Sequence, residues 1–345
     1  MARSGQSNQS AINAVWYGRS PLALLLLPLS LIYWLISGFR RWLFRFELLR
    51  SYRLDAPVIV VGNLSVGGTG KTPVTIWLVN ALKARGFRPG VVSRGYRGNV
   101  GSAPLPVLPH SDPATVGDEP VLIAERCECP VAVHPDRVAA GHLLLEQGID
   151  VVVADDGLQH YRLQRDAELC VVDGQRGFGN GFVLPAGPLR EPTSRLRQID
   201  VVLVNDHGGL AIDLPYAGSP EHFRMLPGAL RRIDGEATLP LSDLAGAQIH
   251  AVAAIGNPDR FFATLRSNGI DVIEHPLADH AALHSGDLKF DDELPVVITE
   301  KDAVKCRQFG VEGVWVLPVD AEFDNEQWLD TLLDKTLALQ PRANA

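Results

Sequence analysis

Residues 58–72 read VIVVGNLSVGGTGKT, a run of valine and isoleucine followed by a glycine-rich loop that ends in Gly-Lys-Thr. The apolar run predicts a buried β-strand, and the residues that follow Lys71 predict a helix over about Thr72–Arg85. A glycine-rich loop between a strand and a helix can turn successive backbone N–H groups toward an anion, and the helix N-terminus adds its positive end. The stretch therefore predicts a phosphate-binding loop, or P-loop, within an α/β fold.

The P-loop predicts how a nucleotide would be held. Lys71 would reach the β- and γ-phosphates of ATP, and the hydroxyl of Thr72 would bind Mg²⁺. Ser65 stands at the first glycine position of the G-x-x-x-x-G-K-[ST] pattern, and Gly67 and Gly68 supply the backbone freedom that this glycine would give. The expected nucleotide-binding residues are Ser65, Val66, Gly67, Gly68, Thr69, Gly70, Lys71 and Thr72.

An acidic pair follows another apolar run. Asp155 and Asp156 come directly after a strand predicted over Ile149–Ala154. A carboxylate at the tip of a buried strand beside a P-loop is placed to hold Mg²⁺ directly or through water. One of the two could instead cap a turn, but adjacent aspartates repel each other unless a cation is near. The pair therefore predicts a metal site.

Short apolar strands alternate with amphipathic helices from Ala56 onward, which predicts a P-loop NTPase-like parallel sheet covered by helices on both faces. A stretch rich in glycine and proline, 218–229, precedes a second series of strands and a last helix near Asn325–Leu339. We expect a P-loop kinase core domain over 56–230 and a smaller α/β domain over 245–345.

The composition excludes several classes of protein. With 345 residues, 46% hydrophobic and 21% charged, the chain is neither wholly disordered nor a polytopic membrane protein. A net charge of −8 argues against nucleic acid as a partner. Four cysteines do not indicate a disulfide framework in a chain of this length, which fits a cytosolic compartment.

Residues 1–55 differ from the rest, because they hold seven arginines and only two acidic residues. No charge occurs over 20–39, and about 20 apolar residues suffice to cross a bilayer. Pro28 and scattered aromatic residues favour an in-plane or hairpin helix on the membrane surface, with a single-pass anchor and a buried core helix as alternatives. If the segment spanned the bilayer, the arginines at 40–53 would keep the rest of the chain on the cytoplasmic side. We expect 1–55 to be a membrane-associating helical segment.

Three classes of P-loop protein can be compared. A GTPase switch would carry Asn/Thr-Lys-x-Asp, but the nearest string, Thr299–Asp302, has Glu300 where lysine belongs. A partition-type ATPase would carry a second lysine where this chain has Val66. A small-molecule or lipid kinase requires neither feature. The sequence therefore favours a kinase, with a membrane-recruited nucleotide switch or assembly factor as the alternative.

Six motifs occur in order along the chain, at 61–73, 93–96, 117–120, 155–160, 184–192 and 299–305. Together they closely resemble the tetraacyldisaccharide 4′-kinase family of lipid A biosynthesis, from the N-terminal apolar segment to about residue 320. Ser65 is also usual in that family. The resemblance implies ATP-dependent phosphorylation of the 4′-hydroxyl of a tetraacylated glucosamine disaccharide 1-phosphate. The enzyme would be peripheral or monotopic on the cytoplasmic face of the inner membrane, with no obligate protein partner.

The resemblance also implies catalytic residues. Asp118, in a Gly-Asp-Glu-Pro turn, matches the residue taken as the family's catalytic base, although such a turn forms for structural reasons equally often. His280 resembles the histidine that partners this base, and here Ala281 follows it where the family often has a second histidine. Three further groups can be assigned from their chemistry. Arg94 and Arg97 would contact the substrate phosphate or the transferring group, unless they are ordinary surface arginines. Glu191 would be a further metal carboxylate, unless it pairs with a neighbouring arginine.

Overall fold

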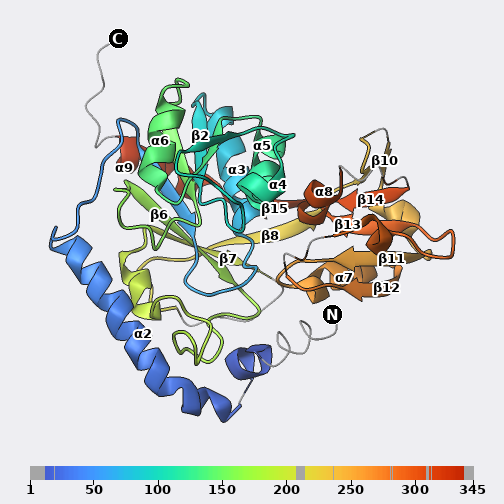
Figure 1. The fold of residues 1–345 in the computed structure, drawn as a ribbon, viewed down its shortest axis with the longest axis horizontal. Helices are drawn as coiled ribbons and strands as arrows, with labels where there is room; N and C mark the ends of the chain where they lie inside the picture. Colours follow the sequence, from blue (N-terminus) through green and yellow to red (C-terminus); the bar gives the residue numbers. More distant parts are fainter. Residues whose placement is uncertain are drawn as a thin grey trace. The chain divides into compact units, whose positions relative to one another are not determined.

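The computed structural model describes residues 12–18, 20–206, 214–235, 237–279, 281, 283–307, 311 and 313–337. His280 lies outside these ranges. The described chain divides into two compact units (Figure 1). We call 12–224 together with 321–337 the P-loop unit, and 225–320 the second unit.

The P-loop unit is built on a nine-stranded sheet with the strand order β15-β8-β7-β6-β1-β5-β2-β4-β3. The strands are β1 (Val58–Gly62), β2 (Pro89–Ser93), β3 (Leu105–Val107), β4 (Val131–Val133), β5 (Val151–Asp155), β6 (Ala167–Asp173), β7 (Val201–Asn205), β8 (Glu221–Pro227) and β15 (Val319–Phe323). The pairs from β4 through β2, β5, β1, β6 and β7 to β8 are parallel, and β3 is antiparallel to β4. Every residue of β1, β2, β5, β6 and β7 is buried. The predicted parallel α/β sheet is confirmed.

Helices cover both faces of this sheet (Figure 1). Val58 and Val60 pack in one cluster with Val138 and Leu144 of α6, whereas α3 contacts β1, β5 and α5. Alternate residues of a strand point to opposite faces, so both faces of β1 are apolar. The helices are α3 (Lys71–Ala84), α4 (Pro113–Val116), α5 (Asp118–Cys127), α6 (Arg137–Leu145) and α9 (Gln327–Leu337), with a 3-10 helix at Thr193–Gln198.

The second unit has its own sheet, with the strand order β10-β9-β14-β13-β11-β12. The strands β11, β12, β13 and β14 are parallel, and two apolar clusters form its core. Its elements are β9 (Leu230–Arg232), β10 (Thr238–Leu239), β11 (Gln248–Ala253), α7 (Pro258–Ser267), β12 (Asp271–Pro276), β13 (Val296–Thr299), α8 (Glu300–Cys306) and β14 (Val314–Leu317), with 3-10 helices at Leu241–Leu244 and Ser285–Leu288.

The last helix packs elsewhere than the strand pattern indicated. We expected it within a domain over 245–345, but β15 and α9 belong to the P-loop unit. Trp77 of α3 contacts Phe323 and Trp328 with ring centroids 4.1 and 5.5 Å apart, and Arg85, the C-cap residue of α3, pairs with Asp330 at 2.7 Å. The amphipathic pattern predicts the helix but not the sheet that it covers.

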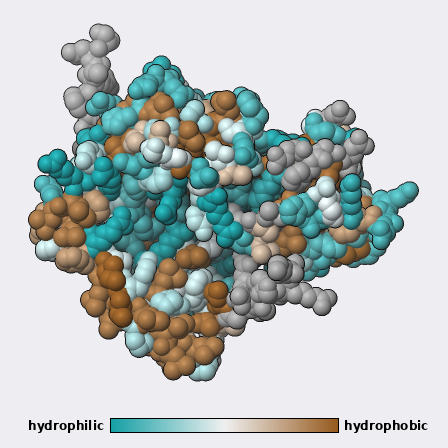
Figure 2. Space-filling view, in the orientation of Figure 1, coloured by the Kyte–Doolittle hydropathy of each residue, from teal (hydrophilic) through white to brown (hydrophobic). Residues whose placement is uncertain are grey.

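Helix α2 (Leu22–Arg45) lies along the P-loop unit with most of its surface exposed. Only 11% of its apolar window is buried, and the helix is long and apolar enough to cross a membrane. Figure 2 shows hydrophobic atoms gathered where Figure 1 draws α2. Ser30 and Tyr33 attach the helix by donating to the carbonyls of Val183 and Arg190 at 2.9 and 3.0 Å. An exposed apolar helix does not fit the alternative of a buried core helix.

Candidate active site

The P-loop runs from the end of β1 to the start of α3, and neighbouring loops fix its backbone. The N–H of Val66 donates to the carbonyl of Pro188 at 2.8 Å. Asn63 Nδ2 donates to the hydroxyl of Thr69 at 3.1 Å, and Asn205 Nδ2 donates to the carbonyl of Thr69 at 3.3 Å. The loop is therefore held in place by side chains at the ends of β1 and β7.

Two glycines allow the bend of this loop. Gly67 has a φ of 117° and Gly70 a φ of 99°, in the region that residues with a side chain rarely adopt. A Cβ on Gly67 or Gly68 would meet no atom within 4 Å, so this side of the loop is open. Gly70 caps α3, whose first N–H groups lack partners within the helix and are available to an anion.

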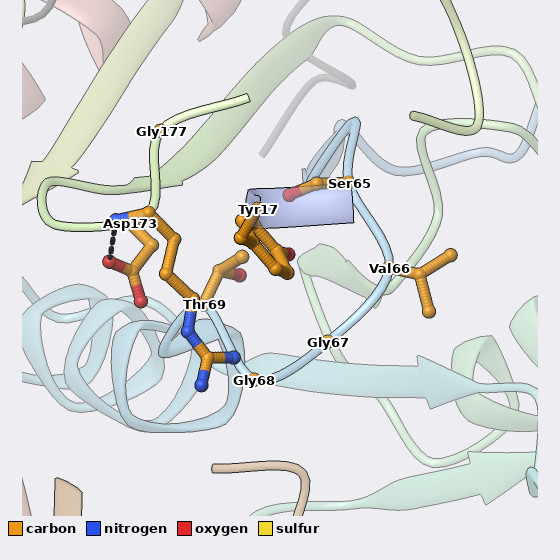
Figure 3. A pocket seen from close by; sticks show the side chains of 9 residues that line it. Tyr17, Ser65, Val66, Gly67, Gly68, Thr69, Asp173 and Gly177 are labelled. Atoms are coloured by element: carbon orange, nitrogen blue, oxygen red, sulfur yellow. Dashed lines mark hydrogen bonds between the residues drawn. The ribbon is translucent and has the colours of Figure 1, made fainter. Parts of the chain in front are cut away.

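A small cavity lies beside the P-loop and is lined by Tyr17, Ser65–Thr69, Asp173, Arg176 and Gly177 (Figure 3). Asp173 ends β6 and accepts a hydrogen bond from the N–H of Arg176 at 2.9 Å. The guanidinium of Arg176 lies 5.4 Å from the ring centroid of Tyr17. Tyr17 was not predicted as part of this site, because no sequence pattern links a residue of the N-terminal segment to a loop some fifty residues later.

Asp155 is buried at the end of β5 and is held by two hydroxyls. Its oxygens accept from Thr75 Oγ1 at 3.2 Å and Ser93 Oγ at 3.3 Å. Burial, followed by the negative charges of Glu119 and Asp156, raises the pKa of Asp155 to about 7. Burial and charge repulsion both disfavour the ionised carboxylate, and a nearby cation would favour it.

Asp156 lies between two cations. Nη1 of Arg190 is 3.0 Å from both of its carboxylate oxygens, and Lys71 Nζ is 3.7 Å from Oδ1. Burial alone would raise the pKa of Asp156, but Lys71 and Arg190 hold it well below its usual range. Nη2 of Arg137 donates to the backbone carbonyl of Asp156 at 2.8 Å. The predicted P-loop lysine and acidic pair therefore meet at one edge of the sheet.

Asp118 is buried as the first residue of α5, and its Oδ1 accepts from the N–H of Glu119 at 2.9 Å. The loop after β2 packs against the turn that precedes α5. A Cβ on Gly98 would lie 2.5 Å from the carbonyl oxygen of Thr115, and one on Gly117 would lie 3.0 Å from that of Tyr96. Only glycine allows such close approach of two backbones.

Arg94 and Arg97 are exposed on this loop, which follows the carboxyl end of β2. The carboxyl ends of β1, β2 and β5 share one edge, because these strands are parallel. The P-loop, the acidic pair and the two arginines therefore follow the same edge. Arg94 is also near enough to Arg137 to lower the pKa of that buried guanidinium, although burial is the larger cause.

Glu191 has different partners from Asp156. Its carboxylate accepts hydrogen bonds from Tyr161 Oη and, at 3.4 Å, from Gln159 Nε2. Arg41 of α2 lies 3.7 Å from it, and Arg195 lies 4.0 Å from it. The predicted metal role has no support in this geometry, whereas the structural alternative of pairing with an arginine is observed. Asp156 pairs instead with Arg190, the residue that precedes Glu191 in the chain, and this pairing was not predicted from the sequence.

Within the described ranges, no three histidine, cysteine, aspartate or glutamate side chains gather as a preformed metal cluster.

The stretch Thr299–Asp302, in the second unit, was compared above with the guanine-recognition motif of GTPases. Asp302 is fully buried and accepts from Thr299 Oγ1 at 2.8 Å and from the N–H of Ala254 at 3.0 Å. Thr299 is the N-cap of α8, and the carboxylate of Asp302 is enclosed by Thr299, Ala254 and Lys305, so it is not exposed to a base.

Comparison with known proteins identifies relatives over almost the whole chain. The family model described as tetraacyldisaccharide-1-P 4′-kinase matches residues 22–338. A tetraacyldisaccharide 4′-kinase from Alkalilimnicola ehrlichii is 50% identical over 90% of this chain and 93% of its own length. Another from Xanthomonas campestris is 44% identical over 95% of this chain and 96% of its own length.

A solved structure has the same fold. The crystal structure of LpxK from Aquifex aeolicus in complex with ATP superposes with a TM-score of 0.78 at 30% sequence identity. The match covers 91% of this chain and 99% of that one. The similarity therefore extends over both units and is not confined to the P-loop.

Proposed function

The chain belongs to the tetraacyldisaccharide-1-P 4′-kinase family, and we propose that the residues at the carboxyl edge of its P-loop sheet carry out the phosphoryl transfer. The chain is a kinase of lipid A synthesis that phosphorylates the 4′-hydroxyl of a tetraacyldisaccharide 1-phosphate. What remains to be assigned is the role of each side chain.

ATP is the phosphoryl donor, as the ATP complex of the Aquifex relative supports. The open backbone of Ser65–Gly70 and the free N–H groups at the start of α3 would bind the phosphates. Lys71 would move its cation from Asp156 toward the γ-phosphate, a distance that its flexible side chain can span. Arg190 would remain on Asp156 and keep that carboxylate ionised.

The donor set at this edge fits Mg²⁺. Asp155, Asp156 and the hydroxyl of Thr72 offer oxygen ligands, and Mg²⁺ is usually held by one or two carboxylates together with substrate phosphates and water. Burial, followed by the negative charges of Glu119 and Asp156, raises the pKa of Asp155, and a bound cation would favour its ionised form. When bound, Mg²⁺ would neutralise charge on the phosphates. Glu191 is left out of this set because its partners are Tyr161 and arginines.

Asp118 would act on the acceptor. A carboxylate can orient the sugar hydroxyl and take its proton as the bond to phosphorus forms. Its position at the start of α5, beside the loop that carries Arg94 and Arg97, supports this role. The two exposed arginines would bind anionic groups of the substrate. The proposed partner of this base, His280, lies outside the described residues.

The glycolipid acceptor also accounts for α2. Removing acyl chains from a bilayer costs about 0.8 kcal/mol for each buried CH₂ group, so the enzyme has to reach its substrate at the membrane surface. The exposed apolar face of α2 would enter the inner membrane from the cytoplasmic side as a peripheral or monotopic anchor. The arginines at its C-terminal end would meet anionic headgroups.

The assignment of the phosphoryl-transfer site rests on the contact between Lys71 and Asp156. Incubation with γ-labelled ATP and the tetraacyl disaccharide 1-phosphate tests it. Label should enter the glycolipid only when Mg²⁺ is present, and ATP should be consumed far more slowly when the glycolipid is omitted. ATP hydrolysis at the same rate without the acceptor would instead indicate a nucleotide switch.

A further inference from the structure

A second cavity lies between α2 and the body of the P-loop unit, and the phosphoryl-transfer site does not use it. Its volume is about 830 Å³. Gly38, Arg41, Trp42 and Arg45 line it from one face of α2, at the spacing of neighbouring helical turns. Residues 163–168, together with Arg195, Gln198 and Asp200, supply part of the opposite wall.

This cavity opens at the other edge of the sheet from the P-loop. Its wall includes Ala167 and Glu168 at the amino end of β6, whereas Asp173 at the carboxyl end of β6 lines the cavity beside the P-loop. A strand rises about 3.3 Å per residue, so Glu168 and Asp173 are separated by ~17 Å. The two cavities are therefore distinct sites on one unit.

The charges in the cavity leave a cationic excess. Five arginines and three acidic residues line it. Each acid already has a cation: Asp166 pairs with Arg53 at 2.6 Å, and Asp200 pairs with Lys335 at 2.7 Å. Glu168 is 2.6 Å from Arg195 and 3.0 Å from Arg165. The remaining arginines, Arg41 and Arg45, both come from α2.

Arg41 and Arg45 are free to bind an anion from outside. Arg45 forms no ion pair with any residue in the described part of the chain and is exposed. Among the described residues, Arg41 has one ion pair, the 3.7 Å contact with Glu191, whose carboxylate also accepts hydrogen bonds from Tyr161 and Gln159. Two guanidinium groups four residues apart can both donate to one phosphate group.

The surface next to these arginines is apolar and aromatic. Phe39, Trp42 and Phe46 are exposed, with ring centroids 5.9 Å apart for the first pair and 4.8 Å for the second. Aromatic rings beside arginines are typical of the membrane interface, where one end of a ligand is charged and the rest is apolar. A free phosphate would use only the arginines, whereas an amphiphile would use both surfaces.

We propose that this cavity is a binding site for the headgroup of an anionic glycerophospholipid, separate from the site of the glycolipid acceptor. The phosphate binds Arg41 and Arg45, and the acyl chains follow Phe39 and Trp42 into the bilayer. The proposal rests on the membrane location assigned above to α2. Its effect is to fix the C-terminal end of that helix at the surface of an anionic membrane.

Calorimetric titration of the full chain in nonionic detergent tests this site, with dihexanoyl phosphatidylglycerol and dihexanoyl phosphatidylcholine as soluble probes. The anionic lipid should bind with saturation at one equivalent. The neutral lipid has the same phosphate, but the arginines repel its choline cation, so it should bind about tenfold more weakly. Arg45→Gln should lower the affinity for the anionic lipid by about tenfold. Arg50→Gln, an exposed arginine outside the cavity, is the matched control and should leave the affinity unchanged.

Four results would overturn the proposal: equal affinity for the two lipids, equal weakening by Arg45→Gln and Arg50→Gln, displacement by inorganic phosphate at matched concentration, or competition by the tetraacyl disaccharide 1-phosphate. The last would make the cavity part of the acceptor site. Turnover of the same samples separates this site from the proposed function. Lipid binding without any kinase activity would count against the function alone, and activity without lipid binding would count against the site alone.

Discussion

Lys71 Nζ lies 3.7 Å from Oδ1 of Asp156, which joins the first residue of α3 to the residue that follows β5. The two residues are 85 positions apart in the chain and meet because β1 and β5 are parallel neighbours. In the ATP-bound state the lysine has to serve a phosphate as well. Asp156 stays ionised while Lys71 binds the phosphate, because Arg190 donates hydrogen bonds to both of its carboxylate oxygens.

Replacing Lys71 should nearly abolish turnover. Lys71→Ala removes the lysine cation of the P-loop, and the loss of a group that stabilises developing charge costs about 10²–10³ in kcat. The measurement is label transfer from γ-labelled ATP at saturating glycolipid. Lys83→Ala, in the last turn of the same helix, is the control and should keep near-normal kcat. A fully active Lys71→Ala enzyme would exclude the P-loop role.

Arg190 should prove to be a positioning residue that acts through Asp156, and Glu191 a structural residue. Arg190→Gln should lower kcat by about tenfold, because Asp156 loses a charged hydrogen bond of ~1.5–3 kcal/mol. Glu191→Gln should leave kcat within about twofold but lower the free energy of unfolding by ~1–3 kcal/mol, since a buried carboxylate bonded to Tyr161 and near Arg195 is lost. Steady-state kinetics and urea unfolding measure the two effects. A changed Mg²⁺ requirement in Glu191→Gln would return this residue to the metal site.

Asp118→Asn should lower kcat by about 10²–10⁴, the range for loss of a general base. ATP affinity should be unchanged, because Asp118 would act on the acceptor and not on the nucleotide. Fluorescent-nucleotide binding and single-turnover transfer give the two quantities. Asp112→Asn, which alters the nearby N-cap of α4, is the control for structural disturbance. Weaker ATP binding in Asp118→Asn would place the residue with the nucleotide instead.

His160 should make the protein less stable in mild acid. Burial, with the charges of Arg137 and Arg165 in second place, lowers the pKa of His160 to about 3, and its buried Nε2 has no hydrogen-bond partner among the described residues. The unfolded chain takes up a proton near pH 6.5 and the folded chain does not. The free energy of unfolding should therefore fall as the pH drops from about 6.5 toward 3, by up to ~1.4 kcal/mol per pH unit from this residue.

The histidine contribution is best measured as a difference. Asp155, with its raised pKa, acts in the opposite direction, because the folded chain holds a proton that the unfolded chain releases between about pH 4 and 7. Urea unfolding of the parent and of His160→Gln between pH 4 and 7.5 isolates the histidine, since Asp155 is common to both. A parent and variant with parallel curves would show that His160 titrates normally.

Serine substitutions on the exposed face of α2 should weaken membrane binding without affecting the site. Leu25 and Ile36 are 75% and 65% exposed, so Leu25→Ser and Ile36→Ser remove apolar surface that no other described part of the chain covers. Each should lower vesicle partitioning by about tenfold or more, since a buried apolar side chain contributes ~1.5–3 kcal/mol. Flotation measures partitioning, and turnover in detergent should remain normal. Unchanged flotation would show that the exposed face of α2 does not bind the membrane.

The sequence predicted the elements that local patterns encode. The strand, glycine loop and helix of 58–84 formed as expected, because apolar runs, glycines and a helix start are all local signals. The acidic pair was also found, because it follows a buried strand. The proximity of Lys71 to Asp156 followed from the parallel sheet, in which strand ends share an edge.

Tertiary relationships were harder to predict. Arg190 and Glu191 are neighbours in a loop without regular periodicity, and only the fold decides which of them faces Asp156. The return of β15 and α9 to the P-loop unit depends on the contacts of Trp77, which an amphipathic pattern does not specify. The cavity under α2 combines residues more than 100 positions apart, and no spacing in the sequence indicates it.

A crystal structure of the chain with Mg²⁺ and a non-hydrolysable ATP analogue tests the central assignment most directly. We predict the β- and γ-phosphates on the N–H groups of Gly67–Thr72, with Lys71 turned from Asp156 toward the γ-phosphate and the metal at Asp155 and Asp156. A triphosphate bound at another surface, with Lys71 still paired to Asp156, would contradict the account.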